Sequence, residues 1–439
     1  MKIKDIVRFH SETTTPIPDV VYHLYSLPSF DNNQTREELL GQDIQSNKFT
    51  VPNRCILFNK LNVRFKRIWR IDSDEDHKIA STEFLPLIID ENKVDFDYCF
   101  YLLASPAITD YLCGQNANTS GSHKRIDPTN FFNIGIKLPP LAQQYEIGKL
   151  LSSLDTKIKL NRQINQNLEA MAKQLYDYWF VQFDFPNGEG KPYKSSGGKM
   201  VWNEKLKREI PQGWNNGMLI DIANITMGQS PDGSSYNEVG EGMLFYQGST
   251  DFGMRFPSVR QYTTAPSRYA KRGDILMSVR APVGSINIAN NDCCIGRGLS
   301  AINSKLGSTT HLYYILNDLR IAFEQRNAAG TTFGSITKED LYSLPIIIPS
   351  HEVIRAFDKI CSPMFDRQMI LGEEIDNLIK QRDGLLPLLM NGQVSVNSDL
   401  SVYKKRRGKV PLLDSKRCVR HLSPSSAIHN CFGQRILDR

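Results

Sequence analysis

Two stretches of the sequence concentrate Lys and Arg side chains without any Asp or Glu. Residues 44–71 contain seven such cations and residues 252–273 contain five, with aromatic residues interspersed in both. Cationic side chains neutralise phosphates, and long hydrogen-bond donors beside them can reach base edges. A solvated protein surface is the alternative for either cluster alone, but their matching places in the two halves favour a nucleic-acid surface.

The candidate DNA contacts come from these clusters and from the glycine-rich strands that follow the second one. For Arg280 and Arg297, which lie beside glycine turns, bracing of a loop remains an equal alternative. The candidates are Lys48, Lys60, Arg64, Arg67, Arg255, Lys271, Arg272, Ser278, Arg280 and Arg297.

The net charge is concentrated at one end of the chain. The 439 residues carry +6, but the last 44 hold ten Lys/Arg against three Asp/Glu, a net +7, so the remainder sums to −1. Any nucleic-acid surface must therefore be local. Residues 395–439 show no hydrophobic pattern, and we expect a basic, disordered tail there.

Membrane, disulfide and metal chemistry have little support in the sequence. No run of about 18 apolar residues could span a membrane. Eight cysteines without a CxxC pair are typical of free thiols in a reducing cytoplasm. Cys418, His421, His429 and Cys431 could ligate a metal, but their irregular spacing favours a chance cluster.

A long amphipathic helix is predicted over residues 139–180. Two series of mostly apolar residues recur there every seven positions, offset by four, which is the spacing of a coiled-coil seam. Asn161 and Asn165 occupy seam positions, where a buried amide can fix the register of paired helices. The pattern returns in phase 210 residues later, which predicts the partner helix. The predicted seam residues are Ile147, Leu151, Leu154, Ile158, Asn161, Asn165, Leu168, Leu175, Leu371, Ile375, Leu378, Leu385 and Leu389.

The segments that flank the helices obey the same shift, which indicates a duplicated unit. Ile134 and Ile136, for example, correspond to Leu344 and Ile346. Within the first copy, residues 51–71 read as two strands around a loop, and residues 96–109 read as a helix. Residues 311–325 are a plausible helix of the second copy.

Several motifs, in a repeated order, carry a resemblance to a known family. They are IPQGW (210–214), RGDILMSVRAPVG (272–284), IGRGLSAI (295–302), LPPLAQQ (138–144) and ITKEDL (336–341). YSLPSFDN (25–32) and ILFNKLN (56–62) match a variant of the same domain. Residues 1–394 thereby resemble the specificity subunit of type I restriction-modification systems.

The resemblance implies an α+β fold in which two α/β target recognition domains are separated by two long helices that form an antiparallel coiled coil with a pseudo-two-fold repeat. It assigns the recognition domains to residues 1–138 and 183–348 and the spacer helices to residues 139–182 and 349–394. Each domain would read one half of a split DNA target in the major groove. The specificity subunit would bind no cofactor. Two modification subunits would hold AdoMet and methylate adenine, and restriction subunits would use ATP and Mg²⁺.

Some features depart from the family or leave room for rival functions. The first half lacks the IPxGW opening, and Gln368 and Arg382 stand at seam positions, which suggests that the second helix is partly exposed or faces a partner. Lys157, Lys159, Arg162 and Glu169 are predicted to form an outer face that docks the modification subunits.

Self-sufficient catalysis and a protein-only coiled-coil adaptor are the rival interpretations. A methyltransferase would need an Asn/Asp-Pro-Pro-Tyr/Phe motif, but the one Pro-Pro pair precedes Leu141. Asp232 and Glu238 could be nuclease carboxylates, but no suitably placed Lys follows them.

Overall fold

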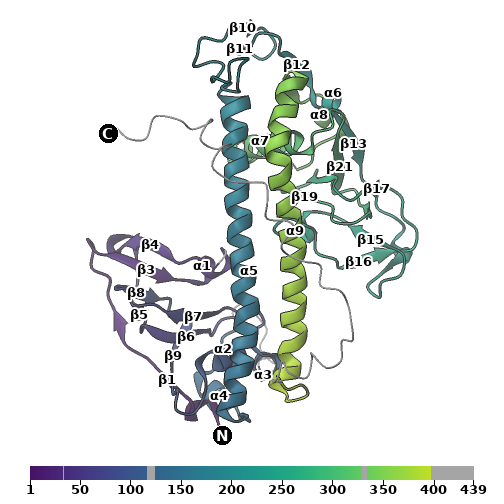
Figure 1. Ribbon diagram of the computed structural model, residues 1–439. Helices are drawn as coiled ribbons and strands as arrows, with labels where there is room; N and C mark the ends of the chain where they lie inside the picture. The colour runs from purple at the N-terminus through teal and green to yellow at the C-terminus, as the bar shows by residue number, and fades with distance from the viewer. Residues whose placement is uncertain (33, 116–123, 329–333, 397–439) are drawn as a thin grey trace, which may run out of the picture.

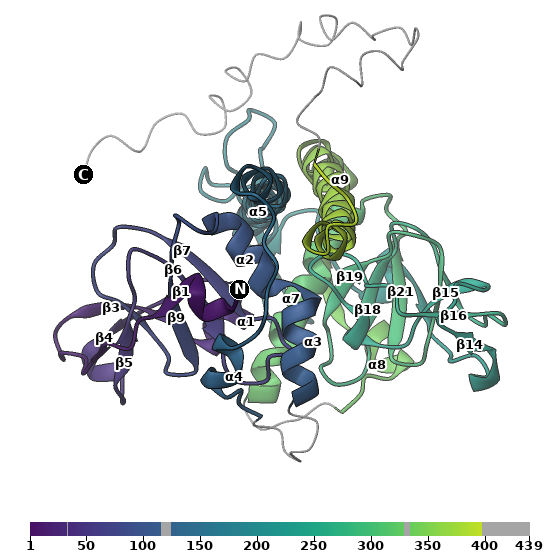
Figure 2. The same ribbon diagram turned by 90° about the horizontal axis from the view of Figure 1, so that it is seen from below.

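Two long helices and two globular units make up the computed structural model, which describes residues 1–32, 34–115, 124–328 and 334–396. The helices lie side by side, the first unit beside the lower half of α5 and the second beside the upper half of α9 (Figure 1). Viewed along the helices, the first unit packs against α5 and the second against α9 (Figure 2).

The first unit combines two sheets with short helices. Its four-stranded antiparallel sheet has the order β1 (Val7–Phe9), β9 (Phe84–Ile89), β6 (Arg54–Asn59), β7 (Ile68–Asp72). Its five-stranded sheet has the order β2 (Thr13–Thr14), β5 (Lys48–Thr50), β8 (Lys78–Ala80), β3 (Val21–Tyr25), β4 (Glu37–Leu40), with β3 and β8 parallel. The helical segments are η1 (Ile3–Asp5), α1 (Leu27–Asp31), η2 (Gly41–Asp43), α2 (Phe96–Ala104), α3 (Pro106–Gln115) and α4 (Pro128–Phe132).

The second unit repeats this plan. Its four-stranded sheet has the order β13 (Ala223–Met227), β21 (Leu299–Ser304), β18 (Ile275–Ser278), β19 (Ile286–Ile288). Its five-stranded sheet has the order β14 (Tyr236–Asn237), β16 (Gln261–Thr263), β15 (Met243–Tyr246), β20 (Cys293–Ile295), β17 (Tyr269–Ala270), again with one parallel pair, β15 and β20. A further pair joins β12 (Asn215–Met218) to β22 (Pro345–Ile348). The helical segments are α6 (Leu219–Ile222), η4 (Gly233–Ser235), η5 (Ser249–Asp251), α7 (Thr309–Ala328) and α8 (Lys338–Tyr342).

The long helices begin close to the residues that the sequence predicts. Helix α5 (Leu141–Tyr176) begins after Pro140, and its last turn widens into the π-helical turn η3 (Asp177–Val181). The chain then forms the hairpin β10 (Met200–Asn203) and β11 (Arg208–Pro211). Helix α9 (His351–Met390) begins at Ser350, whose hydroxyl accepts the Val353 N–H, and continues through two internal prolines. At about 1.5 Å per residue, α5 is roughly 54 Å long and α9 roughly 60 Å.

Each unit is fixed to one end of the helix pair because residues of both helices complete its core. The first core contains Ile147 and Leu151 of α5 together with Leu386 and Leu389 of α9. The second core contains Tyr176 of α5 and the residues Trp179, Phe180, Phe357 and Cys361. The buried apolar area at each end therefore holds the two helices and one unit together.

The predicted fold class, α+β with two globular parts and a long antiparallel helix pair, is confirmed. The two strands expected within residues 51–71 are β6 and β7, and the helix expected at residues 311–325 lies within α7. The helix expected at residues 96–109 is instead interrupted at Ser105, because Pro106 cannot continue the hydrogen-bond ladder of α2.

Candidate DNA-binding surfaces and the helical spacer

The clearest candidate surface of the first unit is the tip of the β6–β7 hairpin. Lys60, Arg64 and Arg67 lie in or beside this loop. The Ile126 N–H donates to the Lys60 carbonyl over 3.0 Å, which joins the tip to the segment before α4. Arg125, which the sequence analysis missed, consequently lies beside the tip.

The second unit has the equivalent arrangement at the β18–β19 hairpin. The Ile336 N–H donates to the Val279 carbonyl over 2.9 Å, and Ile336 is Ile126 shifted by 210 residues. The Val279 N–H donates to the Gly298 carbonyl over 2.9 Å, so the exposed Arg280 and Arg297 lie on neighbouring turns. The repeat at 210 residues was the signal that could have located this pair of tips.

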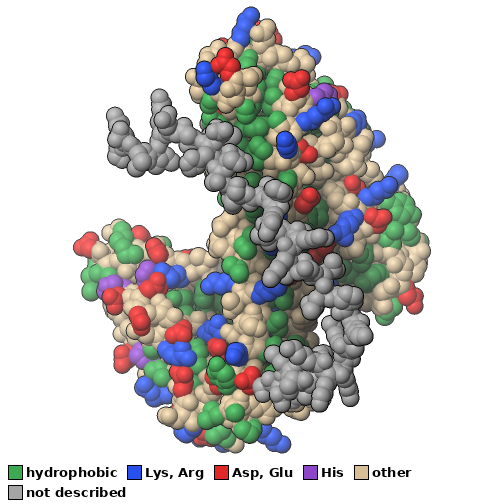
Figure 3. All heavy atoms as spheres, in the orientation of Figure 1, with side chains coloured by type: hydrophobic (Ala, Val, Ile, Leu, Met, Phe, Trp, Pro, Cys, Tyr) green, Lys and Arg blue, Asp and Glu red, His purple; other side chains and the backbone are tan. Residues whose placement is uncertain are grey.

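Carboxylates already pair with part of these cations. The Arg67 guanidinium donates two hydrogen bonds of 2.7 Å to Asp31 and thereby lowers the pKa of that carboxyl. Arg125 likewise binds Glu83 and lowers its pKa. Figure 3 shows Lys and Arg interspersed with Asp and Glu on the visible face, without a single large cationic patch. At the first tip, two of the cations thus already have carboxylate partners within the unit.

Two predicted DNA contacts are corrected by their burial. Ser278 is 1% exposed, and its hydroxyl donates to the Pro282 carbonyl over 2.5 Å and accepts the Ser285 N–H, so it holds the hairpin turn. The Arg255 side chain is 9% exposed and lies 3.5 Å from a Glu169 carboxylate oxygen of α5. A cluster of cations in the sequence does not reveal which side chains turn inward.

The remaining candidates are dispersed. Arg272 donates to Glu373 of α9 over 2.5 Å, so it faces the spacer. Lys271 is exposed beside it, at the opposite end of β18 from Arg280. Lys48 is partly exposed on β5, in the five-stranded sheet. The candidates of the second unit are thus divided between the hairpin end, with Arg280 and Arg297, and the spacer end, with Arg272.

The centre of the helix pair contains a polar network. Arg382 donates to Asp155 over 2.8 Å, and the same carboxylate accepts a 2.6 Å hydrogen bond from Tyr101 of α2. The Asn161 amide donates to Glu374 over 3.0 Å. Because position 155 contacts position 382 and position 161 contacts position 374, the two helices run antiparallel. The side chains of Arg382 and Asp155 are each 29% exposed, so this ion pair is partly buried between the helices.

Gln368 therefore corrects the prediction that its part of α9 is partly exposed or faces a partner, whereas the Arg382 side chain is 29% exposed. Gln368 is 1% exposed and donates to the Asn165 carbonyl over 3.2 Å and to Glu169 over 3.0 Å. Glu169 thus faces α9 rather than forming an outer face, whereas Lys157, although paired with Glu374, keeps 54% of its side chain exposed.

The other predicted seam residues occupy three parts of the helix pair. Ile147 and Leu151 belong to the first core, as does Leu389, and Leu385 packs against that core. Ile158, Ile375 and Leu378 form a separate cluster with Leu154 at the centre. Asn165 and Leu371 are buried, Leu168 is partly buried, and Leu175 packs against the second core.

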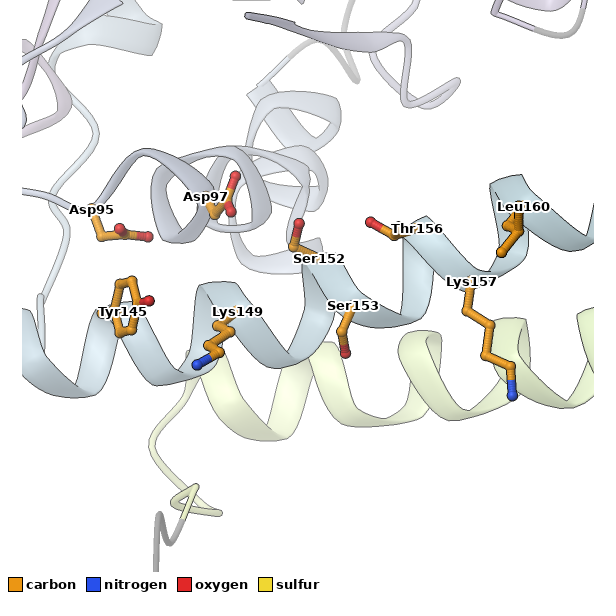
Figure 4. Close-up of a pocket in the computed structure, with 9 residues that line it drawn as sticks. All are labelled: Asp95, Asp97, Tyr145, Lys149, Ser152, Ser153, Thr156, Lys157 and Leu160. Atoms are coloured by element: carbon orange, nitrogen blue, oxygen red, sulfur yellow. The ribbon is translucent and has the colours of Figure 1, made fainter.

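A groove of about 570 Å³ lies where α2 meets α5 (Figure 4). Asp95 and Asp97 line it from the start of α2, and Tyr145, Lys149 and Ser152 line it from α5, with further residues toward Leu160. The close approach requires Gly148, because a Cβ there would lie 2.7 Å from an Asp95 carboxylate oxygen.

The second unit has a corresponding groove of about 380 Å³. Its lining includes Arg355, Lys359 and Ser362 of α9, which are Tyr145, Lys149 and Ser152 shifted by 210 residues. The duplication therefore extends to the grooves where each unit joins the spacer.

Comparison with known proteins assigns this architecture. The family described as "Type I restriction modification DNA specificity domain" matches residues 1–170 and 211–381. The chain belongs to this specificity family. A Methanocaldococcus jannaschii protein assigned as the specificity subunit of the type I restriction enzyme MjaX is 31% identical over 378 residues, which cover 82% of this chain and 83% of the relative. The specificity subunit of the Haemophilus influenzae enzyme HindI is 24% identical, covering 77% and 86%.

The comparison extends to a solved structure. The S subunit of a type I restriction-modification system from M. genitalium has the same fold, with a TM-score of 0.55 at 14% identity, covering 89% of this chain and 95% of that one. The predicted role as a non-catalytic DNA-recognition subunit is confirmed by the family, and neither the self-sufficient enzyme nor the protein-only adaptor is favoured.

The structure offers no support for a membrane span or a metal site within residues 1–32, 34–115, 124–328 and 334–396. There, no helix is long and apolar enough to cross a membrane, and no group of three His, Cys, Asp or Glu could hold a metal. The described cysteines are free thiols. Asp232 caps a short helix by accepting the Ser234 N–H over 2.9 Å. Cys418, His421, His429, Cys431 and the basic tail lie outside the described residues.

Proposed function

We propose that the chain reads a DNA target in two parts, one with each globular unit, and that the helix pair sets the gap between them. The observation that carries this proposal is that each core is completed by both helices at opposite ends of the pair. In this assignment, residues 1–138 and 183–348 are the recognition domains, and residues 139–182 and 349–394 are the spacer.

The length of the spacer is compatible with a split site on B-DNA. The first core is rooted at Ile147 and the second at Trp179. These 32 positions correspond to about 48 Å at 1.5 Å per residue, or between one and one and a half turns of B-DNA at about 34 Å per turn. Two readers on one rigid spacer would then contact the same duplex.

The hairpin tips are the proposed reading surfaces. Lys60, Arg64 and Arg67 would act in the first unit, and Arg280 and Arg297 would act in the second. Arg side chains suit this role because they bind phosphates and can also bind guanine in two places. The backbone contacts shared by the two tips support equivalent roles.

The proposed partners are two modification subunits, which hold AdoMet and methylate adenine, and restriction subunits, which use ATP and Mg²⁺. The two equivalent grooves beside α5 and α9 support two copies of one partner, since a repeated surface accommodates a repeated subunit. This chain would contribute recognition and positioning, without a cofactor of its own, in the cytoplasm where the DNA lies.

Methylome sequencing of a host that carries the chain and its modification subunits tests the proposal. We expect methylated adenines in one motif of two defined parts separated by a fixed gap. A motif without a gap, or methylation unaffected by deletion of this chain, would contradict it. Incubation of the purified chain alone with DNA and labelled AdoMet should give no transfer. A gel shift should weaken steeply with salt because binding releases counterions from phosphates.

A further inference from the structure

The second unit has an additional contact with the middle of α9. Phe256, on the loop after η5, is 5% exposed and forms an apolar cluster with Ile288 and Phe365. Its ring lies against Gly372, where an added Cβ would come within 2.5 Å of the ring. We call this contact of the Phe256 ring with Gly372 and Phe365 the seat. It requires glycine at position 372 because a larger side chain would overlap the ring.

The neighbouring residue connects the same loop to both helices. The Arg255 guanidinium lies 3.5 Å from Glu169 of α5 and 4.6 Å above the Phe365 ring of α9. Gln368 donates to the same Glu169 carboxylate over 3.0 Å. The Arg255 side chain is 9% exposed and the Glu169 side chain is 34% exposed, so this ion pair is partly shielded from solvent.

The first unit has no such seat on α5. By the 210-residue repeat, Phe365, Met369 and Gly372 of α9 correspond to Asp155, Lys159 and Arg162 of α5. These side chains are polar, and Asp155 is held by Tyr101 and Arg382. An apolar ring from the first unit could not be buried there. The first unit thus does not repeat the apolar contact at Gly372; at the matching place on α5, Tyr101 of the first unit binds Asp155 instead.

We propose that Arg255 and Phe256 are positioning residues that set the length of the gap in the DNA target. They hold the second recognition unit at one place and angle on the spacer, while the hydrogen bond from Tyr101 to Asp155 holds the first unit. The inference rests on the proposed function. It concerns neither base identity nor methyl transfer, because both side chains are directed at the helices and are buried.

The test compares two glycine substitutions in α9. Gly372→Leu forces the Phe256 ring off its seat, whereas Gly384→Leu places the same side chain where an added Cβ meets no atom within 4 Å. Both changes raise helix propensity equally. Each full chain is assembled with its modification subunits and given a DNA library with the native half-sites and gaps of varied length, and methylation is measured by sequencing.

Wild type and Gly384→Leu should methylate one gap length. Gly372→Leu should raise relative methylation at gaps one base pair longer or shorter by about tenfold, with unchanged half-site bases. Phe256→Ala, which empties the seat without a clash, should act similarly. Phe256→Ala should leave the unit folded because Phe256 lies outside the main core. If Gly372→Leu unfolds the chain, the gap preference of Phe256→Ala is the test of the proposal.

The inference and the proposed function fail in different ways. Wild-type assemblies without any preferred gap would contradict the proposed function itself. A wild type with a single preferred gap that Gly372→Leu and Phe256→Ala retain unchanged would overturn the role of the seat. Altered half-site bases would overturn it as well, since they would assign these residues to base reading.

Discussion

Lengthening both helices by one heptad should lengthen the gap in the DNA target. A copy of residues 153–159 would be inserted after Lys159 in α5, and a copy of residues 369–375 after Ile375 in α9. Both points lie between the Asp155–Arg382 pair and the seat at Gly372, so the attachments of both units are preserved. The copied Ile158 would pack against Ile375 and the copied Leu371, which repeats the central cluster.

The expected change follows from helix geometry. Seven residues add about 10.5 Å and fall only about 20° short of two full turns, so the two units keep nearly the same relative orientation. At about 3.4 Å per base pair, the preferred gap should increase by roughly three base pairs. Affinity should fall even at the new gap, because three base pairs rotate the groove by about 100°.

The assay is selection of bound DNA from a library with fixed half-sites and varied gaps. An unchanged preferred gap in a folded double-insertion variant would refute the spacer hypothesis. Insertion into α5 alone is the matched control. It shifts the partners of the seam residues, so we expect loss of stability and of binding rather than a new gap.

Three further predictions concern the helix pair and the second core. Asn165→Leu should stabilise the chain by about 1–3 kcal/mol, seen as a higher unfolding midpoint, because both polar atoms of this buried amide are unpaired. Asp155→Asn should destabilise it by about 1–3 kcal/mol because Arg382 loses its carboxylate partner on the other helix and retains its neighbour Asp383. In a double-mutant cycle, Arg382→Met should recover much of the loss, and simple additivity would contradict the pairing. Burial lowers the pKa of His311 to about 3. Below the unfolded pKa near 6.5 the unfolded state therefore binds the extra proton, and stability should fall by up to about 1.4 kcal/mol per pH unit as the pH decreases from 6.5 toward 3. His311→Phe should flatten this dependence in urea titrations at pH 4–7, and an unchanged slope would assign it to other groups.

The sequence was sufficient to predict the elements but not their facing surfaces. The heptads and the 210-residue repeat predicted the paired helices, because periodicity depends on residue types within one helix. The prediction for Gln368 is wrong because its partner, Glu169, lies on the other helix, 199 residues away in the chain. A polar residue can be buried in a seam when the other helix supplies a hydrogen-bond partner, and the sequence of one helix does not show that partner.

For the candidate DNA contacts, too, the sequence predicts where cations are concentrated but not which way each side chain points. Composition correctly places cations at the β6–β7 tip, where Arg64 is exposed. It could not separate Arg255, which is directed at Glu169, from its neighbours in the same cluster. The direction in which a side chain points depends on strand register and on close approaches such as the one at Gly372. Neither can be recognised from the amino-acid composition of the segment.

The shared cores restrict how this architecture can diversify. Leu386 and Leu389, at the end of α9, are buried in the first core, and Tyr176, at the end of α5, is buried in the second. A new first unit must therefore fit the end of α9 as well as the start of α5. A new second unit must in addition occupy the seat at Gly372. A new first unit must likewise supply a partner for Asp155 of α5, as Tyr101 does here. We therefore expect either unit to be exchanged without a change of gap only where it keeps its contact with the middle of the spacer.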